Sequence, residues 1–321
     1  MSTEKNSLSP IYKLSDTSLH NIYVKREDLI PYSFGGNKAR KAMLFFEDYD
    51  SGDYDHMVTY GSSHSNHCRI IANICAGRHI PCTIVAPGEV SDRTYNSDLI
   101  DLFGAETITV PVDDVHDTIE KKLDELRSDG HKPYFIAGGG HGNIGTESYV
   151  RCYEEIREFE QREGISFDHI FLASGTGTTQ AGLVCGQILS KAPGTIVGIS
   201  IARKNPRGRE VILDSIRDYL DSRNISYDMS GIEEKTIFID DYTGDGYGKN
   251  SPKIDDTIRT AMIEHGLPLD STYTGKAFFG MKEYLKVNDI APDDNILFIH
   301  TGGTPLFFDD LSRMYDNRPS E

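Results

Sequence analysis

The sequence predicts an α/β protein in which twisted, parallel-rich sheets are covered by helices. Three observations lead to this fold class. Short apolar runs alternate with amphipathic stretches along most of the chain, glycine and small hydroxyl residues recur where the apolar runs end, and the 321 residues suffice for one large domain or two modest ones. Strict alternation of strand and helix is typical of a parallel sheet that is buried on both faces.

Most predicted strands are short apolar segments that are followed by a stretch with helical spacing. The strands are expected over residues 56–61, 81–88, 106–111, 132–140, 167–175, 195–203 and 295–303. The helices are expected over residues 65–79, 97–104, 117–130, 146–160, 178–190, 209–220, 252–266 and 275–285. Residues 241–252 are the most turn-rich segment, and the chain shows neither an internal repeat nor a low-complexity stretch.

The composition is that of a soluble globular protein, with 38 % hydrophobic and 26 % charged residues. The formal net charge of −17 argues against nucleic acid or an anionic membrane as a partner, because both require a positive face. A local anion site built from a few lysines and backbone amides remains compatible with this charge. We expect no signal peptide at the N-terminus, and no apolar run approaches the length of a membrane span.

The cysteines are five in number and include no CxxC pair. We therefore expect reduced thiols and a cytoplasmic protein. Each cysteine is expected to be a small core residue: Cys68, Cys75, Cys82, Cys152 and Cys185.

The ends of the predicted strands carry the residues that can bind a ligand. In open parallel sheets, ligands bind at the carboxyl ends of the strands. The candidate loops are residues 60–67, 136–143, 172–182 and 300–305.

The loop SGTGTTQAG (174–182) joins a predicted strand to a predicted helix, an arrangement that holds phosphate well. The candidate phosphate ligands are Gly175, Thr176, Gly177, Thr178 and Thr179. A dinucleotide fingerprint fails because position 180 is Gln, and the GK[ST] end of a nucleotide P-loop is absent. A glycine-rich connection without a ligand is the alternative.

The stretch GGNKARK (35–41) places two lysines one helical turn apart, directly after a bend. Lys41 could neutralise a phosphate near the 174–182 loop, and Lys38 in a pocket that lowers its pKa would suit Schiff-base chemistry. The alternative is a solvated basic cluster of Lys38, Arg40 and Lys41. A basic first turn opposes the helix dipole, which points to a nearby anion.

Five motifs in order resemble the pyridoxal-phosphate enzymes of the tryptophan-synthase-β fold, fold type II. They are FGGNKARK (34–41), SSHSNH (62–67), SGTGTTQAG (174–182), YTGKA (273–277) and HTGG (300–303). Within that group the chain resembles the D-cysteine desulfhydrase and 1-aminocyclopropane-1-carboxylate deaminase family, from about residue 8 to residue 310. The resemblance implies a large cofactor-binding domain of residues 1–44 plus 160–321, a small βα domain of residues 45–159, and a homodimer.

The resemblance also implies a role for each motif residue. The cofactor-binding residues would be Lys38, Lys41, Asn66, Gly175, Thr176, Gly177, Thr178, Thr179, Tyr247, Thr274 and Thr301, with Gly302 beside the ring. Lys38 would carry the cofactor covalently, Asn66 would meet its phenolic oxygen, and Tyr247 would stack on its ring. The catalytic residues would be Lys38, Ser65 and Tyr273. The substrate-binding residues would be Ser63, Ser65, Asn66, His67, His141 and Tyr273.

Thr274 is the residue that decides the expected reaction. A neutral hydroxyl at the pyridine nitrogen leaves that nitrogen largely unprotonated, which favours loss of a β-substituent. The cyclopropane-opening deaminases of the family carry Glu in this motif, whereas this chain has YTGK like the desulfhydrases. We therefore expect a lyase that performs α,β-elimination on a β-substituted amino acid and releases a 2-oxo acid and ammonia. Deaminase-like ring opening, a β-replacement synthase and a non-enzymatic cofactor-binding protein are the alternatives.

Two loops depart from the family pattern. The serine loop reads HSN where Gln-Ser-Asn is common, and GGGHGN stands where GGSN is usual. His64 and His141 could therefore indicate a different β-substituent or a more acidic substrate. No metal is expected, although zinc bound by His64, His67 and His141 is an alternative. Arg69 is expected to be structural. One of two further residues is expected to touch the pocket: Glu147 or Tyr149.

Overall fold

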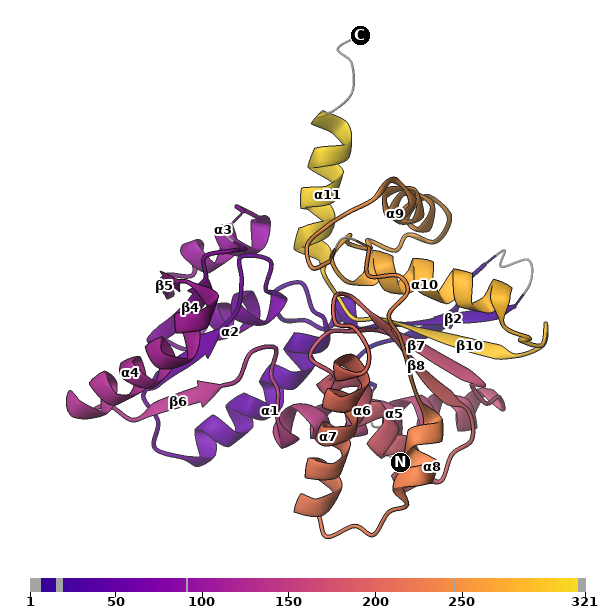
Figure 1. Cartoon of the computed structure of the whole chain (residues 1–321), viewed down its shortest axis with the longest axis horizontal. Coiled ribbons are helices and arrows are strands. Elements are labelled where there is room, and N and C mark those ends of the chain that lie inside the picture. Colours follow the sequence, from indigo (N-terminus) through magenta and orange to yellow (C-terminus); the bar gives the residue numbers. More distant parts are fainter. Residues whose placement is uncertain (1–6, 16–19, 91, 245, 317–321) are drawn as a thin grey trace, which may run out of the picture.

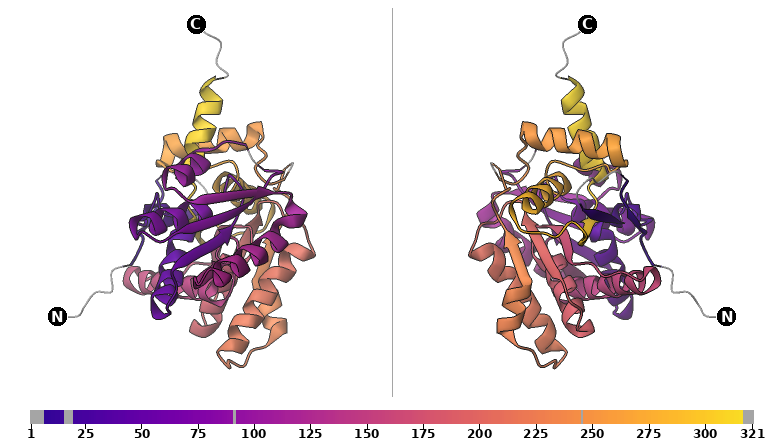
Figure 2. Two further views of the ribbon diagram at one scale, coloured as in Figure 1. Left: turned by 90° about the vertical axis from the view of Figure 1, so that its left-hand side faces the viewer. Right: turned by 90° about the vertical axis from the view of Figure 1, so that its right-hand side faces the viewer.

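The computed structural model describes residues 7–15, 20–90, 92–244 and 246–316. Over these ranges the strands form a six-stranded sheet and a four-stranded sheet. The smaller sheet and its helices lie on the left of Figure 1, and the larger sheet lies on the right. The side views in Figure 2 show the smaller sheet facing the viewer in one panel and the larger sheet in the other. The loops that form the candidate site lie between them.

The larger sheet pairs strands from both ends of the chain. In spatial order its strands are β1 (Ile11–Lys13), β2 (Asn21–Arg26), β10 (Asn295–His300), β7 (His169–Ser174), β8 (Thr195–Ser200) and β9 (Thr236–Ile239). Only β1 and β2 pair in antiparallel fashion among these described strands. Phe298 of β10 lies opposite Phe171 of β7 and Val24 of β2, so that apolar side chains stack across the sheet.

Helices cover both faces of the larger sheet. One face is covered by α5 (Asn143–Glu163), α6 (Thr178–Ser190), α7 (Arg207–Ser222) and α8 (Met229–Lys235), and the other by α9 (Pro252–His265), α10 (Thr274–Val287) and α11 (Thr304–Asp316). Leu172 packs in the core on the first face, whereas its neighbour Phe171 packs on the second. This alternation is the period of two that a strand imposes.

The smaller sheet is parallel throughout its described strands. In spatial order these are β5 (Glu106–Val110), β4 (Cys82–Pro87), β3 (His56–Tyr60) and β6 (Pro133–Ile136). Its helices are α1 (Asn37–Ser51), α2 (Asn66–Gly77), α3 (Tyr95–Leu102) and α4 (Val115–Ser128). The short 3-10 turns η1 (Glu27–Leu29) and η2 (Val112–Asp114) precede α1 and α4. Val58 and Val85 face α4, and Met57 and Ile84 face α1 and α2, so both faces are buried.

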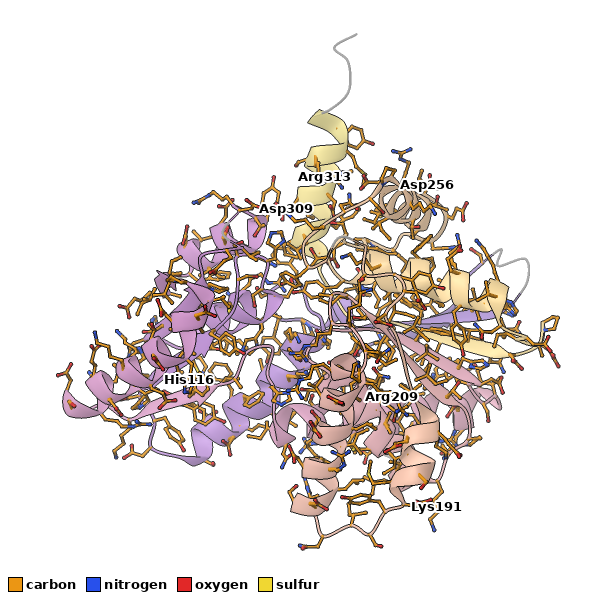
Figure 3. All side chains as sticks on the ribbon, viewed as in Figure 1. His116, Lys191, Arg209, Asp256, Asp309 and Arg313 are labelled. Carbon is orange, nitrogen blue, oxygen red and sulfur yellow. The ribbon has the colours of Figure 1, made fainter. Side chains whose placement is uncertain are left out.

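Helix α11 connects the two halves at the top of Figure 1, and Asp309 and Arg313 are labelled on it in Figure 3. Asp309 accepts a hydrogen bond of 3.0 Å from the backbone N–H of Tyr95 at the start of α3. Arg313 forms an ion pair with Asp255 on α9. The helix therefore contacts elements of both sheets.

The predicted α/β fold with parallel-rich sheets is confirmed, and each predicted strand and helix corresponds to an observed element. The elements β1, β2, β9, α8 and α11 lie outside the predicted ones, and only the start of α1, at GGNKARK, was expected. The division into residues 1–44 plus 160–321 and residues 45–159 stays a prediction. Side chains of α5 from Tyr149 to Phe159 pack in the core of the larger sheet, which favours a boundary before α5.

All five cysteines are buried and carry free thiols, as predicted. Cys68, Cys75 and Cys82 pack in the core of the smaller sheet, and Cys152 and Cys185 pack in that of the larger sheet. Within the described ranges, no helix is both long and apolar enough to cross a membrane.

Candidate active site

A cavity of about 380 Å³ lies where loops from both sheets meet. Its walls come from the start of α1 and from residues that follow the carboxyl ends of β3, β6, β7, β8 and β10. Ligand-binding crevices of open parallel sheets lie at these ends. The cavity therefore occupies the place that the strand-end motifs predict.

Most of the predicted site residues line this cavity. They are Lys38, Ser65, Asn66, His67, Gly175, Thr176, Gly177, Thr179, Tyr247, Tyr273, Thr301 and Gly302. The remaining ones do not line it: Lys41, Ser63, His141, Thr178 and Thr274. The structure thus brings the five motifs together and separates a few of their members from the cavity wall.

Lys38 enters the cavity because two glycines turn the chain just before α1. Gly35 and Gly36 have φ of +60° and +104°, and a Cβ on Gly36 would lie 2.8 Å from the carbonyl oxygen of Thr301. Lys38 donates from Nζ to the carbonyl oxygen of Gly139 at 3.0 Å. Burial lowers the pKa of Lys38 to about 8, because the charged form loses its hydration. The fraction of free, nucleophilic amine near neutral pH is therefore larger than for an ordinary lysine.

Lys41 lies one turn further along α1, fully buried behind the cavity wall. Its Nζ lies 3.4 Å from the same Gly139 carbonyl oxygen. Burial lowers the pKa of Lys41 well below its ordinary value, and the nearby Lys38 charge lowers it further. An anion bound at this wall would favour the charged form of both amines, which burial disfavours.

The loop between β7 and α6 presents a helix N-terminus to the cavity. Gly177 caps α6 with φ of +91°, and a Cβ there would lie 3.0 Å from Ile212. Asn37 donates from Nδ2 to the Thr179 hydroxyl at 3.0 Å, which joins this loop to α1. Backbone N–H groups in the first turn have no partner within the helix. The loop has the geometry of a phosphate site.

Ser65 and Asn66 form the start of α2. Ser65 caps the helix, with its Oγ accepting a hydrogen bond of 3.1 Å from the Cys68 N–H. The Asn66 side-chain oxygen accepts a hydrogen bond of 3.1 Å from Asn96, which leaves the Asn66 amide N–H groups to donate into the cavity. Ser63 instead donates to the carbonyl oxygen of Val90, away from the cavity.

His67 has a defined tautomer. The Thr59 hydroxyl donates to the carbonyl oxygen of Ile136 at 2.7 Å, so it can only accept from His67 Nε2, which lies 2.9 Å away. Nε2 therefore carries the proton, and the buried Nδ1 has no partner among the described residues. Burial lowers the pKa of His67 well below its ordinary value, assisted by the charges of Lys38 and Lys41. His67 is neutral at pH 7.

Tyr247 and Tyr273 form one wall of the cavity as an edge-to-face pair. Their ring centroids are 5.9 Å apart at an interplanar angle of 78°, and their hydroxyl groups are hydrogen-bonded to each other. Burial raises the pKa of Tyr273 well above its ordinary value. The stacking role of Tyr247 and the substrate contact of Tyr273 stay predictions.

Thr274 begins α10 beneath the cavity and bonds to Asp270. Its hydroxyl donates to Asp270 Oδ2 at 2.7 Å and accepts from the Asp270 N–H at 2.9 Å. Asp270 also accepts from the backbone N–H groups of Thr272 and Tyr273. Burial raises the pKa of Asp270 to about 6. The predicted contact of Thr274 with a pyridine nitrogen stays a prediction.

The three histidines considered for zinc have separate partners. His141 Nδ1 lies 2.8 Å from the Thr178 hydroxyl, and His64 lies edge-to-face against Tyr247. Over the described ranges, no group of three or more His, Cys, Asp or Glu side chains could hold a metal ion. The structure therefore gives no support to the zinc alternative.

The expectation that Glu147 or Tyr149 touches the cavity is wrong. Both residues lie on α5 outside the cavity lining. Glu147 accepts from the Tyr219 hydroxyl, and the Tyr149 hydroxyl donates to buried Glu27 at 3.0 Å. Both residues follow the GGGHGN loop closely in the sequence, but their side chains bond to α7 and to η1 instead.

Several cavity residues were given no individual role by the sequence motifs. They are Asn37, Tyr60, Ser62, Gly139 and Arg203. Asn37 lies within FGGNKARK and Ser62 within SSHSNH, so the motifs contained both residues but gave neither a role. Gly139 contributes a backbone carbonyl, for which a sequence carries no side-chain signal.

Comparison with known proteins supplies a family. A family model described as "Pyridoxal-phosphate dependent enzyme" matches residues 4–302. The chain is 31 % identical to a D-cysteine desulfhydrase of Yersinia enterocolitica, covering 94 % of this chain and 92 % of the relative. It is also 31 % identical to a 1-aminocyclopropane-1-carboxylate deaminase of Mesorhizobium japonicum, covering 93 % of each. A crystal structure of an ACC deaminase homologue is 28 % identical and superposes with a TM-score of 0.86 over 97 % of this chain and 95 % of that one.

Proposed function

The chain belongs to the pyridoxal-phosphate-dependent enzymes, and we propose that it is a lyase that eliminates the β-substituent of an amino acid, in the manner of a D-cysteine desulfhydrase. The products are a 2-oxo acid and ammonia. The observation that carries the proposal is the buried amine of Lys38 at a cavity formed by all five strand-end and helix-start motifs.

The residues around the cavity fit pyridoxal phosphate. Lys38 supplies a buried amine with a lowered pKa, which favours its covalent attachment to the aldehyde. The 175–179 loop, together with Lys41 near the Gly139 carbonyl, would hold the phosphate, and Asn66 would donate to the phenolic oxygen. When bound, the cofactor supplies the electron sink for the bond that breaks at the substrate Cα.

Lys38 and Ser65 are the groups placed to move the Cα proton. With substrate bound, Lys38 would be a free amine beside the Gly139 carbonyl, and a pKa of about 8 leaves about half of it uncharged at pH 8. That state suits a general base. Ser65 accepts from the Cys68 N–H through one lone pair of its hydroxyl oxygen, which leaves its hydroxyl proton available to donate. The two groups lie on α1 and at the start of α2, and both of these helices pack on the smaller sheet.

The substrate carboxylate would bind at the start of α2. Ser65, Asn66 and His67 line the cavity there, and the first-turn backbone N–H groups of a helix attract an anion. His67 is neutral with its proton on Nε2, so it does not neutralise the carboxylate. Tyr273 faces the same space from the larger sheet.

A second candidate is cyclopropane ring opening, and one contact favours it. Thr274 gives its hydroxyl proton to Asp270, so it has only a lone pair left for another partner. If Thr274 meets the ring nitrogen, as the resemblance implies, it accepts from a protonated nitrogen, which strengthens the electron sink. The Thr274 hydroxyl is thus hydrogen-bonded to the Asp270 carboxylate. The similarity to a 1-aminocyclopropane-1-carboxylate deaminase also supports this second candidate.

Product analysis separates the candidates. The cofactor-loaded protein is incubated with D-cysteine, L-cysteine, β-chloroalanine, D-serine and 1-aminocyclopropane-1-carboxylate, and 2-oxo acid release is measured. Pyruvate from one cysteine enantiomer supports the lyase. Release of 2-oxobutyrate from the cyclopropane favours the second candidate. A spectral change without any 2-oxo acid indicates a β-replacement synthase. The Lys38→Ala variant serves as the inactive control.

We propose a homodimer, which the family resemblance implies, and a cytoplasmic location, which the free cysteines favour. Size-exclusion chromatography with light scattering tests the first: a mass near twice the 35.8 kDa of the chain supports the dimer, and a mass near 35.8 kDa contradicts it.

A further inference from the structure

Arg69 is a fully buried arginine on α2 whose charge no described side chain balances. Its Nε, Nη1 and Nη2 atoms have no hydrogen-bond partner among the described residues. The Phe34 ring lies near the guanidinium, at 5.9 Å from its carbon to the ring centroid. Burial lowers the pKa of Arg69 to about 9, with no acidic neighbour to raise it.

Such an arrangement is costly and calls for an explanation. A buried guanidinium loses its hydration, and proteins normally compensate for this loss with hydrogen bonds to carboxylates or carbonyl oxygens. The other buried arginine on a cavity helix, Arg40, follows that pattern, with Glu27 and Glu155 as partners. The charge of Arg69 is therefore available to attract a bound anionic ligand.

The position of Arg69 directs this charge toward the cavity wall. Arg69 lies three residues after Asn66 and four after Ser65, so all three lie on neighbouring positions of one helix face. Helical side chains lean toward the helix N-terminus, which carries Arg69 back over the first turn of α2. Ser65, Asn66 and His67 line the cavity at that turn, whereas Arg69 lies behind them.

The residues at the start of α2 do not offset the positive charge of Arg69. His67 is neutral, and Ser65 and Asn66 are uncharged. The positive end of the α2 dipole has the same sign as Arg69, so the two add at the start of the helix. In a buried setting the interaction of one charge with another over a helical turn is far stronger than in water.

We infer that Arg69 is a positioning residue that attracts and orients the substrate's α-carboxylate at the start of α2, acting through space behind Ser65 and Asn66. The inference rests on the proposed amino-acid substrate and deepens it, because it assigns the recognition of the carboxylate to a buried charge. It also replaces the expectation that Arg69 is merely structural.

Binding of paired ligands tests this role without turnover. D-Alanine and L-alanine lack a β-leaving group, and the corresponding alaninamides replace the carboxylate by a neutral group of similar shape. The affinity of each ligand for the cofactor-loaded protein is measured by its spectral change. The variants are Arg69→Met and Arg69→Lys, and the control is Arg78→Met, which removes an exposed arginine at the other end of α2.

The decisive quantity is the preference for alanine over alaninamide, which is the ratio of the two affinities. Arg69→Met is expected to lower it by about tenfold or more, while Arg69→Lys retains most of it and Arg78→Met leaves it unchanged. Arg69→Met is also expected to unfold at the same or a higher temperature, because it removes an uncompensated buried charge. A merely structural arginine would show the opposite result: lower thermal stability and an unchanged preference.

The outcomes also separate this inference from the proposed function. Failure of the wild-type protein to bind any of the four ligands contradicts the proposed amino-acid site. A wild-type preference for alanine that persists in Arg69→Met contradicts the role of Arg69 alone. If Arg69→Met does not fold, Arg69→Gln replaces it, and loss of the preference in Gln with retention in Lys supports the inference, whereas equal preferences in both overturn it.

Discussion

Lys38 on α1 and Gly139 in the loop after β6 are joined by a hydrogen bond of 3.0 Å from the lysine Nζ to the glycine carbonyl oxygen. Gly139 has φ of +71°, and a Cβ there would lie 2.9 Å from Thr176 Cγ2 and 3.3 Å from Lys38 Nζ. One glycine therefore fixes the amine of α1 and leaves room for the loop after β7. The cavity depends on this three-way contact.

Replacing Gly139 by Ala is expected to displace Lys38 and weaken covalent attachment of the cofactor by about tenfold or more. The added methyl group meets both Thr176 and Lys38. Absorbance titration of the cofactor-free protein with pyridoxal phosphate measures the effect. Gly142→Ala is the matched control, because Gly142 also has positive φ but nothing within 4 Å of its Cβ position. Equal loss in both variants would assign the effect to backbone strain.

The Lys38 amine is expected to lose its proton at about pH 8 in the cofactor-free protein, since burial disfavours the charged form. Its reaction with an amine-selective reagent should therefore rise through pH 8 and level off above it, whereas an ordinary lysine with a pKa of about 10.4 continues to rise. Peptide mass spectrometry of protein labelled between pH 6 and pH 11 measures this. Labelling of exposed Lys191, marked in Figure 3, corrects for the pH dependence of the reagent. A Lys38 curve still rising above pH 10 would contradict the lowered pKa.

His67 is expected to make the protein less stable in acid. Its pKa is lowered by burial, so below pH 6.5 the unfolded chain binds a proton at His67 that the folded chain does not bind. Stability then falls as the pH falls below 6.5 and is unaffected by His67 above it. Urea unfolding at pH 5.5, 6.5 and 7.5 should show a smaller acid loss in His67→Gln than in the wild type. The exposed His131→Gln variant should lose stability like the wild type.

Asp270→Asn is expected to destabilise the protein by about 1–3 kcal/mol. The carboxylate accepts from the Thr274 hydroxyl and from the backbone N–H groups of Thr272 and Tyr273, and an amide offers fewer acceptors for these donors. Urea unfolding at pH 7.5 measures the loss. Asp256→Asn on the exposed side of α9, labelled in Figure 3, is the control and should change stability little. If Asp270→Asn has the same free energy of unfolding as the wild type, the carboxylate does not stabilise the start of α10.

The sequence predicts the fold where one helix or strand carries its own signal. The spacing of apolar residues predicts α2, and the buried run before HTGG predicts β10. Strand β2 escaped prediction because it carries Lys25, a charge that a buried strand tolerates only through its 2.6 Å ion pair with Glu155 on α5. That partner is distant in the sequence, so no local pattern reveals it.

The same limit applies to the site. Glycines and small hydroxyl residues at strand ends predict the cavity walls, because ligand loops of parallel sheets need them. The carboxylate behind Thr274 and the carbonyl that holds Lys38 come from Asp270 and Gly139, whose roles depend on tertiary contacts. The unbalanced charge of Arg69 is likewise visible only once its neighbours are known.

The central claim is that Lys38 carries the cofactor, and borohydride reduction followed by peptide mapping tests it most directly. Reduction makes the link between lysine and cofactor permanent, so the mass of the reduced cofactor marks the attached residue. The predicted result is a single modified peptide that contains Lys38, and no modification in Lys38→Ala. The modification on Lys41 or on another lysine, or its persistence in Lys38→Ala, would contradict the account.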